Sequence, residues 1–287
     1  MTVGELKSAC KLAAIINMKG GVGKTTLSFN LAMELAGRGE KVLLIDLDPQ
    51  ANATLVCMSD DERKAHTVNK KSITSLFIDA FEPRVSLNSY TKKPPALNDF
   101  IFNVPLSGDV IEGSCLHFVP SDLYLSSVLR GINLGPYTLD KLLTDNVHKC
   151  YDYTLVDCAP TYSALTTIAL NTCRAVLIPM ISDSFGKHGT DLMKQILDEH
   201  CHDFGTKVGV IGVVFTMVKS GVNQRATERE IVGKWGSDVV FKQSISQNDW
   251  YKVANGQRKP FTKTPAHGDA KGELTGFVDE FIRRISK

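Results

Sequence analysis

The chain has 287 residues, which at roughly 150 residues per domain allows one large domain or two small ones, each with a sizeable core. Hydrophobic residues make up 43% and charged residues 22%, proportions that are typical of a folded globular protein and exclude a disordered or low-complexity chain. The 33 basic residues against 31 acidic ones leave a net charge of +2, which excludes a uniformly basic nucleic-acid coat protein but permits a local basic patch.

The cysteines and the apolar runs indicate a cellular location. Seven cysteines are scattered along the chain without a C-x-x-C pair, which is typical of reduced thiols. No apolar run reaches the roughly 18 residues that cross a bilayer, and Met1–Lys11 is too short and too mixed for a secretory signal. The sequence therefore predicts a cytoplasmic protein.

Short apolar runs alternate with helix-length amphipathic stretches along the chain, which indicates β-α-β units on a parallel sheet. The predicted strands are Leu12–Asn17, Lys41–Asp46, Leu116–Pro120, Tyr153–Asp157, Ala175–Pro179 and Val208–Phe215. The predicted helices are Thr25–Gly37, Ser121–Gly131, Thr138–His148, Tyr162–Thr172, Gly186–His200 and Gln224–Trp235. We therefore expect an α/β fold, a doubly wound and mostly parallel β-sheet flanked by helices, in a single domain over 1–287.

Two segments depart from this rhythm. Residues 58–114 carry charges, prolines and only weak periodicity, so we predict one helix followed by a long irregular insertion on the surface. Near the end of the chain, apolar residues at helical spacing alternate with charged ones, which predicts an amphipathic helix over about 271–286.

The first predicted strand is followed by a glycine-rich loop that leads directly into the first predicted helix. The loop and the start of the helix read Lys19, Gly20, Gly21, Val22, Gly23, Lys24, Thr25 and Thr26. The spacing is one residue short of G-x-x-x-x-G-K-[ST]. The glycines, helix N-terminus, lysine and hydroxyl are nevertheless what phosphate and Mg²⁺ binding require, so the segment predicts a nucleotide-binding P-loop.

The residues KGGVGKTT resemble the deviant Walker A box of the ParA/MinD family of dimeric P-loop ATPases. Other stretches are similar to that family's second box, Walker B strand, late strand and final loop: VLLIDLDPQANAT at 42–54, YDYTLVDCAP at 151–160, GVVFTMV at 212–218 and SISQNDWYKVANGQRKPF at 244–261. The likeness covers about Lys11–Thr54 and Leu116–Phe261, and is strongest to ParA/Soj-type partition ATPases. It implies ATP and Mg²⁺ as cofactors.

The chemistry of phosphoryl transfer assigns roles within the loop. A loose transition state mainly needs charge stabilisation and alignment, so Lys24 is predicted to neutralise the β- and γ-phosphates and Thr25 to ligate Mg²⁺. Thr26 is expected on the α-phosphate side. The resemblance implies that Lys19 reaches the nucleotide of the other subunit in a sandwich dimer, which makes hydrolysis depend on dimerisation.

Three aspartates lie at the ends of predicted strands. Asp46 and Asp48 are two residues apart, so an extended backbone places both on one side, facing the phosphates. A carboxylate that ends an apolar strand is costly unless a cation or donor meets it, so Asp157 is predicted in the outer shell of Mg²⁺. The resemblance implies that Asp48 positions the attacking water, that Asp46 lies near Mg²⁺, and that Thr216 and Met217 contact the adenine.

The resemblance implies a ParA-type ATPase that forms a homodimer with ATP, positions or segregates DNA or another cargo, and is stimulated by a ParB-like activator protein. Nonspecific DNA binding needs clustered basic residues, because counterion release drives it. Between Lys219 and Lys263, nine basic residues stand against four acidic ones, a local net charge of +5. The predicted DNA contacts are Lys219, Arg225, Lys252 and Arg258, which implies association with the nucleoid.

The last loop departs from the family pattern at one position. Family partition ATPases carry an arginine soon after the Asn of that loop, where this chain has Trp250.

Two alternatives to a partition ATPase remain open. A MinD-like membrane-associated regulator would anchor itself through the C-terminal helix, but Glu273, Asp279 and Glu280 dilute its positive charge, so we expect that helix to pack on the protein and no membrane partner. A reductase similar to the nitrogenase iron protein needs two exposed cysteines per subunit, and Cys158 alone is suitably placed.

Overall fold

The computed structural model describes residues 10–81, 96–106, 111–131, 134–143, 149–183, 186–219, 222–266 and 269–286. Within them, seven strands form one sheet in the order β3-β4-β2-β5-β1-β6-β7. The strands are β1 Lys11–Ile15, β2 Lys41–Leu47, β3 Phe102–Val104, β4 Cys115–Val119, β5 Tyr153–Cys158, β6 Ala175–Met180 and β7 Gly209–Phe215. All neighbours pair in parallel except β3, which runs antiparallel to β4 at the edge.

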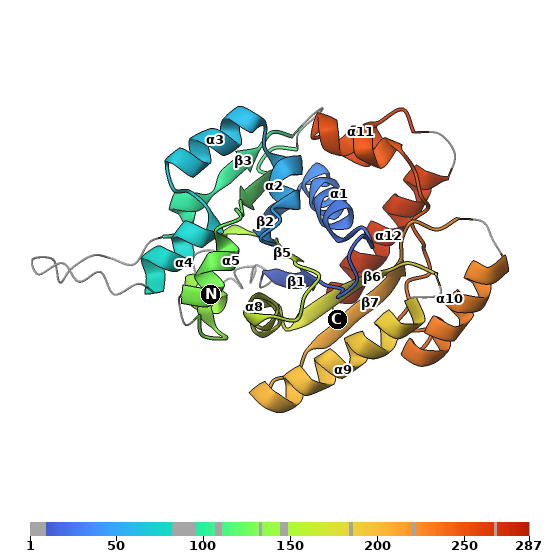
Figure 1. Ribbon diagram of the computed structural model, residues 1–287. Coiled ribbons are helices and arrows are strands. Elements are labelled where there is room, and N and C mark those ends of the chain that lie inside the picture. Colours follow the sequence, from blue (N-terminus) through green and yellow to red (C-terminus); the bar gives the residue numbers. More distant parts are fainter. Residues whose placement is uncertain are drawn as a thin grey trace, which may run out of the picture.

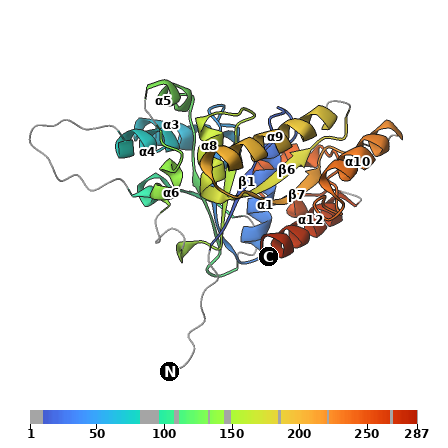
Figure 2. The same cartoon turned by 90° about the horizontal axis from the view of Figure 1, so that it is seen from below.

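Helices cover both faces of the sheet (Figures 1 and 2). One face is covered by α4 Ile73–Phe81, α5 Leu125–Gly131, α6 Thr138–Leu142, α8 Ala164–Cys173, α9 Gly186–Phe204 and α10 Val222–Trp235. The other face is covered by α1 Lys24–Gly37, α2 Asn52–Cys57, α11 Trp250–Gln257 and α12 Ala270–Ile285. Helix α3, Asp60–Val68, has no buried residue and lies outside both layers. The predicted doubly wound α/β fold is confirmed.

The strands divide their side chains between two cores. In β1, Ala14 packs into the core beneath α8 and α9, whereas Ala13 and Ile15 pack into the core beneath α1 and α12. Successive side chains of a strand point to opposite faces, so a strand covered on both sides is apolar throughout. Because both faces are filled, only the ends of the strands are left to meet a ligand.

The predicted helix and strand positions lie within a few residues of the observed ones, and residues 58–114 hold the largest difference. There the sequence predicted one helix and an irregular insertion, but the described part contains α3, α4, the 3-10 helix Leu97–Phe100 and the edge strand β3. Ile73, Leu76 and Phe77 of α4 are fully buried, so this part of the segment belongs to the core. The predicted helix Thr138–His148 ends at Leu142, and its residues 144–148 lie outside the described residues.

The C-terminal helix α12 packs on the protein, as expected. Leu274, Phe277 and Phe281 are fully buried against the sheet. Arg284 donates hydrogen bonds to the carbonyl oxygens of Val239 (2.8 Å) and Val240 (2.9 Å), which fixes the last turn of the helix. The apolar face of α12 is therefore covered by protein. Across the described residues, no helix combines the length and the apolarity that crossing a membrane needs.

Candidate functional site

The glycine-rich loop connects β1 to α1 at the carboxyl edge of the sheet. Gly21 and Gly23 have φ of +73° and +79°, a left-handed backbone that favours glycine. Gly23 is also the N-cap of α1, and a Cβ there would meet the Met217 side chain at 3.4 Å. The loop thus leads the chain tightly into the helix, whose free N–H groups and dipole attract anions at this end.

Lys24 begins α1 and folds back over the loop. Its ammonium donates to the carbonyl oxygens of Asn17 (3.0 Å) and Lys19 (3.1 Å). The residue is 7% exposed, and burial lowers the pKa of Lys24, opposed by the nearby carboxylate of Asp157. An ammonium has three donors, so two carbonyl contacts leave one donor for an anion at the loop.

Two polar side chains that the sequence analysis did not identify hold the loop and helix in place. Asn17 donates through Nδ2 to the carbonyl oxygen of Pro179 (2.8 Å) and accepts the backbone N–H of Lys19 (2.9 Å), joining the loop to β6. Ser28 donates to Asp157 (2.9 Å) from the turn of α1 that follows Lys24. The available signals were the place of Asn17 directly after a buried strand and the hydroxyl of Ser28 four residues after Lys24.

Asp46 and Asp157 lie side by side, because β2 and β5 pair in parallel with these residues in register. Asp157 accepts from Thr25 Oγ1 (2.7 Å) and from Ser28 Oγ (2.9 Å). Burial raises the pKa of Asp157 to about 6 even though these hydroxyl contacts favour its ionised form. The structure thus brings together three predicted site residues, Thr25, Asp46 and Asp157.

Asp46 is fully buried and accepts three hydrogen bonds: from the backbone N–H of Asp48 (3.1 Å), and from the backbone N–H (2.9 Å) and hydroxyl (2.8 Å) of Thr54. Burial, and then the charge of Asp157, raise the pKa of Asp46 to about 8 against the effect of these contacts. Two carboxyl groups held side by side without a cation favour a proton on one of them. A cation bound nearby would favour their ionised forms.

Asp48 follows β2 and starts a turn into α2. Its carboxylate accepts the backbone N–H of Gln50 (2.8 Å), and the side chain is 5% exposed. Ala51 then adopts φ +54° at the N-cap of α2, a left-handed conformation that costs a residue other than glycine about 1 kcal/mol. The segment after Asp48 is therefore a tight and strained turn.

Lys19 lies apart from the buried carboxylates. Its ammonium forms an ion pair with Asp183, which follows β6, with Nζ and Oδ2 2.5 Å apart. The side chains are 29% and 39% exposed, so the pair is at the surface of the loop. The structure therefore holds the two lysines of the loop in different surroundings, Lys24 against carbonyl oxygens and Lys19 against a carboxylate.

A pocket of about 150 Å³ opens beside the loop, between α1, the end of β7 and α11. Its lining includes Thr216 and Met217, the residues predicted to contact adenine, and also Thr26. Thr216 donates to the carbonyl oxygen of Val22 (2.8 Å), which joins β7 to the loop. We call this cavity the loop pocket.

Two further residues of the loop pocket went unrecognised in the sequence. Asn30 Oδ1 and the Tyr251 hydroxyl are buried in the described part of the chain without a hydrogen-bond partner. The Tyr251 ring is stacked on Phe261, with centroids 3.9 Å apart, and burial raises the pKa of its hydroxyl. Buried polar groups are normally satisfied, so the unpartnered atoms of this pocket are suited to a polar ligand.

The four predicted DNA contacts come from separate segments of the chain. Lys219 follows β7 and Arg225 lies on α10, and both are exposed. Lys252 on α11 pairs with Asp249 at 3.0 Å, and Arg258 pairs with Glu62 of α3 at 2.6 Å. The structure therefore distributes this positive charge over two helices and neutralises part of it.

Trp250 begins α11, and its backbone N–H donates to Asn248 Oδ1 (2.9 Å). The indole is partly buried and packs against the core beneath α1 and α12. At this position the chain thus uses an aromatic ring for packing.

The geometry defines a class of protein, an α/β nucleotide-binding protein with a P-loop and buried carboxylates at the carboxyl edge of its sheet. The AAA-domain family matches residues 10–204. The chromosome partitioning protein ParA of Caulobacter vibrioides is 31% identical over 213 residues, which cover 72% of this chain and 69% of that protein. The sporulation initiation inhibitor protein Soj of Bacillus subtilis is 28% identical over 250 residues, 87% of this chain and 89% of Soj.

Solved structures share the fold. The ATP complex of a Cyanothece McdA variant superposes with a TM-score of 0.74 at 21% identity, covering 96% of this chain and 97% of that one. Such a likeness extends over nearly the whole length of both chains. The chain belongs to the ParA family of P-loop ATPases.

Proposed function

We propose that this ParA-type ATPase forms a homodimer with ATP and uses the hydrolysis of ATP to position or segregate DNA or another cargo. The observation that carries the proposal is the group formed by Lys24, Thr25 and Asp157, in which a lysine and a hydroxyl at a helix N-terminus face a buried carboxylate. The ParA relative from Caulobacter vibrioides is a chromosome partitioning protein, and this likeness supports DNA as the cargo.

The side chains at the loop fit ATP with Mg²⁺. Within the described residues, no three His, Cys, Asp or Glu side chains converge to hold a metal by themselves. Mg²⁺ prefers oxygen ligands and is commonly held by one or two protein oxygens together with phosphates and water. Thr25 would supply its hydroxyl, and Asp46 and Asp157 their carboxylates nearby, while the bound cation would neutralise charge on the β- and γ-phosphates.

The roles of the other groups follow from their surroundings. The third ammonium donor of Lys24 would stabilise negative charge on the transferred phosphoryl group. Asp48, at the strained turn after β2, would accept a hydrogen bond from the attacking water and orient it. The backbone N–H groups of Gly20 to Thr26 would hold the phosphates, and Thr216 and Met217 in the loop pocket would hold the base.

Lys19 would act in the second subunit. To reach a nucleotide there it must leave Asp183, so dimerisation and release of that ion pair are coupled in this proposal. A ParB-like activator would then accelerate hydrolysis and end the dimeric state. The exposed Lys219 and Arg225, together with Lys252 and Arg258 once freed from their partners, would bind DNA phosphates without sequence specificity and bring the protein to the nucleoid.

ATP turnover of Lys24→Ala tests the enzymatic part. We expect it to fall by at least about a hundredfold, because a donor aimed at developing charge contributes that much. Lys64→Ala is the matched control, since the Lys64 side chain is 77% exposed on α3. Unchanged turnover in Lys24→Ala would refute the assigned site.

Plasmid binding over a salt series, with ATP against ADP, tests the DNA part. We expect retention only with ATP, and a salt dependence that weakens by about one unit for each of Lys219→Ala and Arg225→Ala. No binding at all would leave a cargo other than DNA, and binding that is independent of the nucleotide would contradict its coupling to ATP.

A further inference from the structure

A second and larger cavity, of about 340 Å³, lies between α2, α3 and the loop that follows β4, on the side of the molecule where α2 and α3 lie (Figure 1). Its lining comes from 50–58, 63–72 and 120–124. We call it the α2–α3 pocket. It adjoins the strained turn after Asp48 but contains no residue of the glycine loop.

Two residues that line the α2–α3 pocket carry buried polar atoms without a partner in the described part of the chain. Ser121 is 5% exposed, lines the pocket, and its hydroxyl has no hydrogen-bond partner among the described residues. Arg63 also lines the pocket, and its Nε is buried in the same unpartnered way, although its Nη2 contacts Asp60. Leaving a buried donor unsatisfied costs about 1–3 kcal/mol, so two such donors on residues that line one cavity point to a ligand with acceptor atoms.

The rim of the pocket is apolar and exposed. Leu55, Leu123 and Tyr124 are 53%, 68% and 70% exposed, although large apolar side chains are normally covered. They come from two segments, α2 and the loop after β4, that pack side by side only in the folded chain. An apolar rim around a polar interior is typical of a surface that binds another protein.

The charges at the pocket favour an anionic ligand. Asp122 is the one carboxylate among the described residues of the lining, and its two oxygens already accept from the hydroxyls of Ser72 (2.6 Å) and Thr74 (2.9 Å) and from the backbone N–H of Tyr124 (2.9 Å). The remaining charged groups of the lining are the guanidinium of Arg63 and the exposed ammonium of Lys71. The donors that are still available thus carry positive charge or none.

From the unpartnered donors, the apolar rim and this charge, we propose that the α2–α3 pocket binds a short peptide segment of a partner protein in which an acidic side chain neighbours apolar ones. The carboxylate and a backbone carbonyl of the peptide would accept from Arg63 and Ser121. The apolar side chains would cover Leu55, Leu123 and Tyr124. Tyrosine and leucine at such a rim lose their contact with water on binding, which supplies affinity.

The site is linked to the carboxylates of the ATPase. The backbone N–H of Ser121 donates to Thr54 Oγ1 (2.9 Å), and the same hydroxyl donates to Asp46 (2.8 Å). A peptide at Ser121 would therefore act two hydrogen bonds from a group of the nucleotide site, a consequence that rests on the proposed function. Binding itself does not depend on it.

Fluorescence anisotropy with labelled decapeptides tests the proposal on the full chain without nucleotide. One set alternates leucine with glutamate, and the matched set replaces each glutamate by lysine. We expect saturable binding of the acidic set only, weakened by up to about tenfold by Ser121→Ala, which removes the hydrogen bond to the peptide's backbone carbonyl. Leu123→Glu should abolish binding, and Leu192→Glu should not, since Leu192 is similarly apolar and 44% exposed but lies on α9.

Equal binding of the two peptide sets, no saturable binding, or equal effects of Leu123→Glu and Leu192→Glu would overturn the proposal.

A second copy of this chain is the competing occupant of the α2–α3 pocket. Sedimentation with ATP, in the Asp48→Ala background, measures self-association and decides between a partner peptide and a second copy. We expect Leu123→Glu to leave self-association unchanged. If this variant loses self-association, the rim is a dimer contact instead. Because the peptide measurement uses no nucleotide, it can succeed or fail independently of the ATPase activity.

Discussion

The loop pocket and the α2–α3 pocket lie on the same protein but are built differently. The first lies beside a loop in which glycines, a lysine and a threonine follow one another within eight residues, and the sequence identified that segment directly. The second is assembled from three segments between Gln50 and Tyr124 that carry no recognisable motif. Both contain a buried hydroxyl without a partner in the described part of the chain, Tyr251 in one and Ser121 in the other. Unsatisfied polar atoms on pocket-lining residues thus give a ground for proposing ligand sites that motifs do not reveal.

The largest effect expected in this comparison concerns Lys19, which belongs to the glycine loop but points to Asp183. Lys19→Ala should weaken ATP-dependent dimerisation about tenfold or more, because it removes a charge proposed to reach the nucleotide of the other subunit. Light scattering in the Asp48→Ala background measures it. Asp183→Asn is the control, since it removes the carboxylate that pairs with Lys19 and keeps the ammonium, and should dimerise at least as well as the parent. Equal dimerisation of Lys19→Ala and the parent would contradict the role.

The two unpartnered hydroxyls give the next test. Tyr251→Phe and Ser121→Ala each remove a buried donor that has no partner among the residues that the structure describes, so the free energy of unfolding of the ligand-free protein should stay level or rise by up to about 1 kcal/mol. Urea denaturation measures this. Each variant should then lose affinity for its own ligand only: ATP for Tyr251→Phe, and the acidic peptide for Ser121→Ala.

A loss of both affinities in either variant would show that the two pockets are not independent. A decrease of about 2 kcal/mol or more in the free energy of unfolding would show that the hydroxyl has an internal partner such as bound water. The hydroxyl would then not indicate a ligand site.

The sequence predicted the features that local patterns specify and missed those that depend on residues far away in the chain. The glycine loop and most of the parallel strands are specified by local patterns, namely glycines at positive φ and runs that are apolar because both faces are covered. Asn17 acts through Pro179, 162 residues away, so its place after a buried strand marks a polar group but does not reveal its partner. The edge strand β3 has three residues and depends on pairing with β4, and such a short strand leaves no periodicity to detect.

Arg258 shows the same limit at the surface. Counting basic residues between Lys219 and Lys263 predicted a DNA-binding cluster. The fold brings Glu62 from 196 residues away to the guanidinium of Arg258. Charges distant in sequence decide whether a basic residue is free for a ligand, and composition does not contain that information.

The carboxylates of the nucleotide site predict a pH dependence that the α2–α3 pocket does not share. Burial holds the pKa of Asp46 near 8 in the folded state, against about 4 in the unfolded chain. Between pH 7 and pH 8 the unfolded chain has already lost this proton while the folded protein keeps it, so stability must fall as the pH rises through this window. We expect a decrease of about 1 kcal/mol in the free energy of unfolding without nucleotide.

Urea denaturation at pH 7 and pH 8, compared between the parent and Asp46→Asn, isolates this contribution because the asparagine does not titrate. The slopes are compared rather than the absolute stabilities, since the amide also changes the contacts to Thr54. Below pH 7, burial lowers the pKa of His200, which makes stability fall toward acid and opposes the trend. Equal slopes in both proteins would show that Asp46 is ionised throughout this range.

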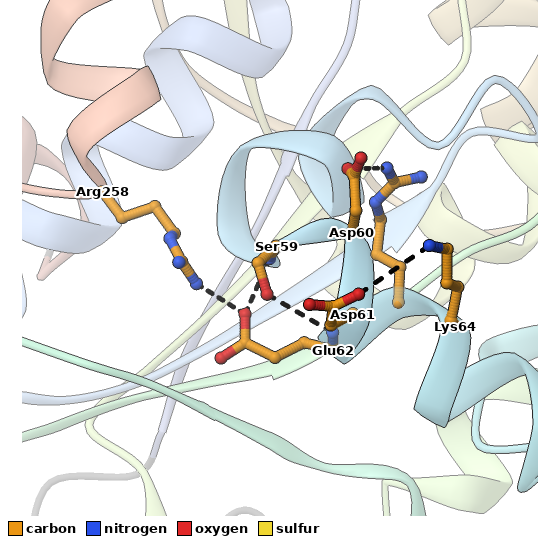
Figure 3. A network of polar contacts seen from close by, with 7 residues as sticks. Ser59, Asp60, Asp61, Glu62, Lys64 and Arg258 are labelled. Atoms are coloured by element: carbon orange, nitrogen blue, oxygen red, sulfur yellow. Dashed lines mark hydrogen bonds and ion pairs between the residues drawn. The ribbon is translucent and has the colours of Figure 1, made fainter.

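The smallest effect concerns the contact that joins the two regions, the ion pair between Glu62 at the start of α3 and Arg258 at the end of α11 (Figure 3). Glu62 also accepts the backbone N–H of Ser59 (2.7 Å) in a capping box. Partial burial opposes the ionised form of Glu62, but the hydrogen bonds from Ser59 and Arg258 outweigh it and lower the pKa of Glu62.

A double-mutant cycle of Glu62→Gln and Arg258→Gln should give a coupling of about 0.5 kcal/mol at low salt, because both side chains are about one-third exposed and the pair is screened. The matched control is Asp61 with Lys64, whose side chains are 97% and 77% exposed and should give no measurable coupling. If the ion pair holds Arg258 away from DNA, Glu62→Gln should also strengthen plasmid binding with ATP. A coupling free energy equal to that of the control, with unchanged plasmid binding, would mean that the Glu62–Arg258 ion pair does not stabilise the contact between α3 and α11. The two pockets would then respond to their ligands separately.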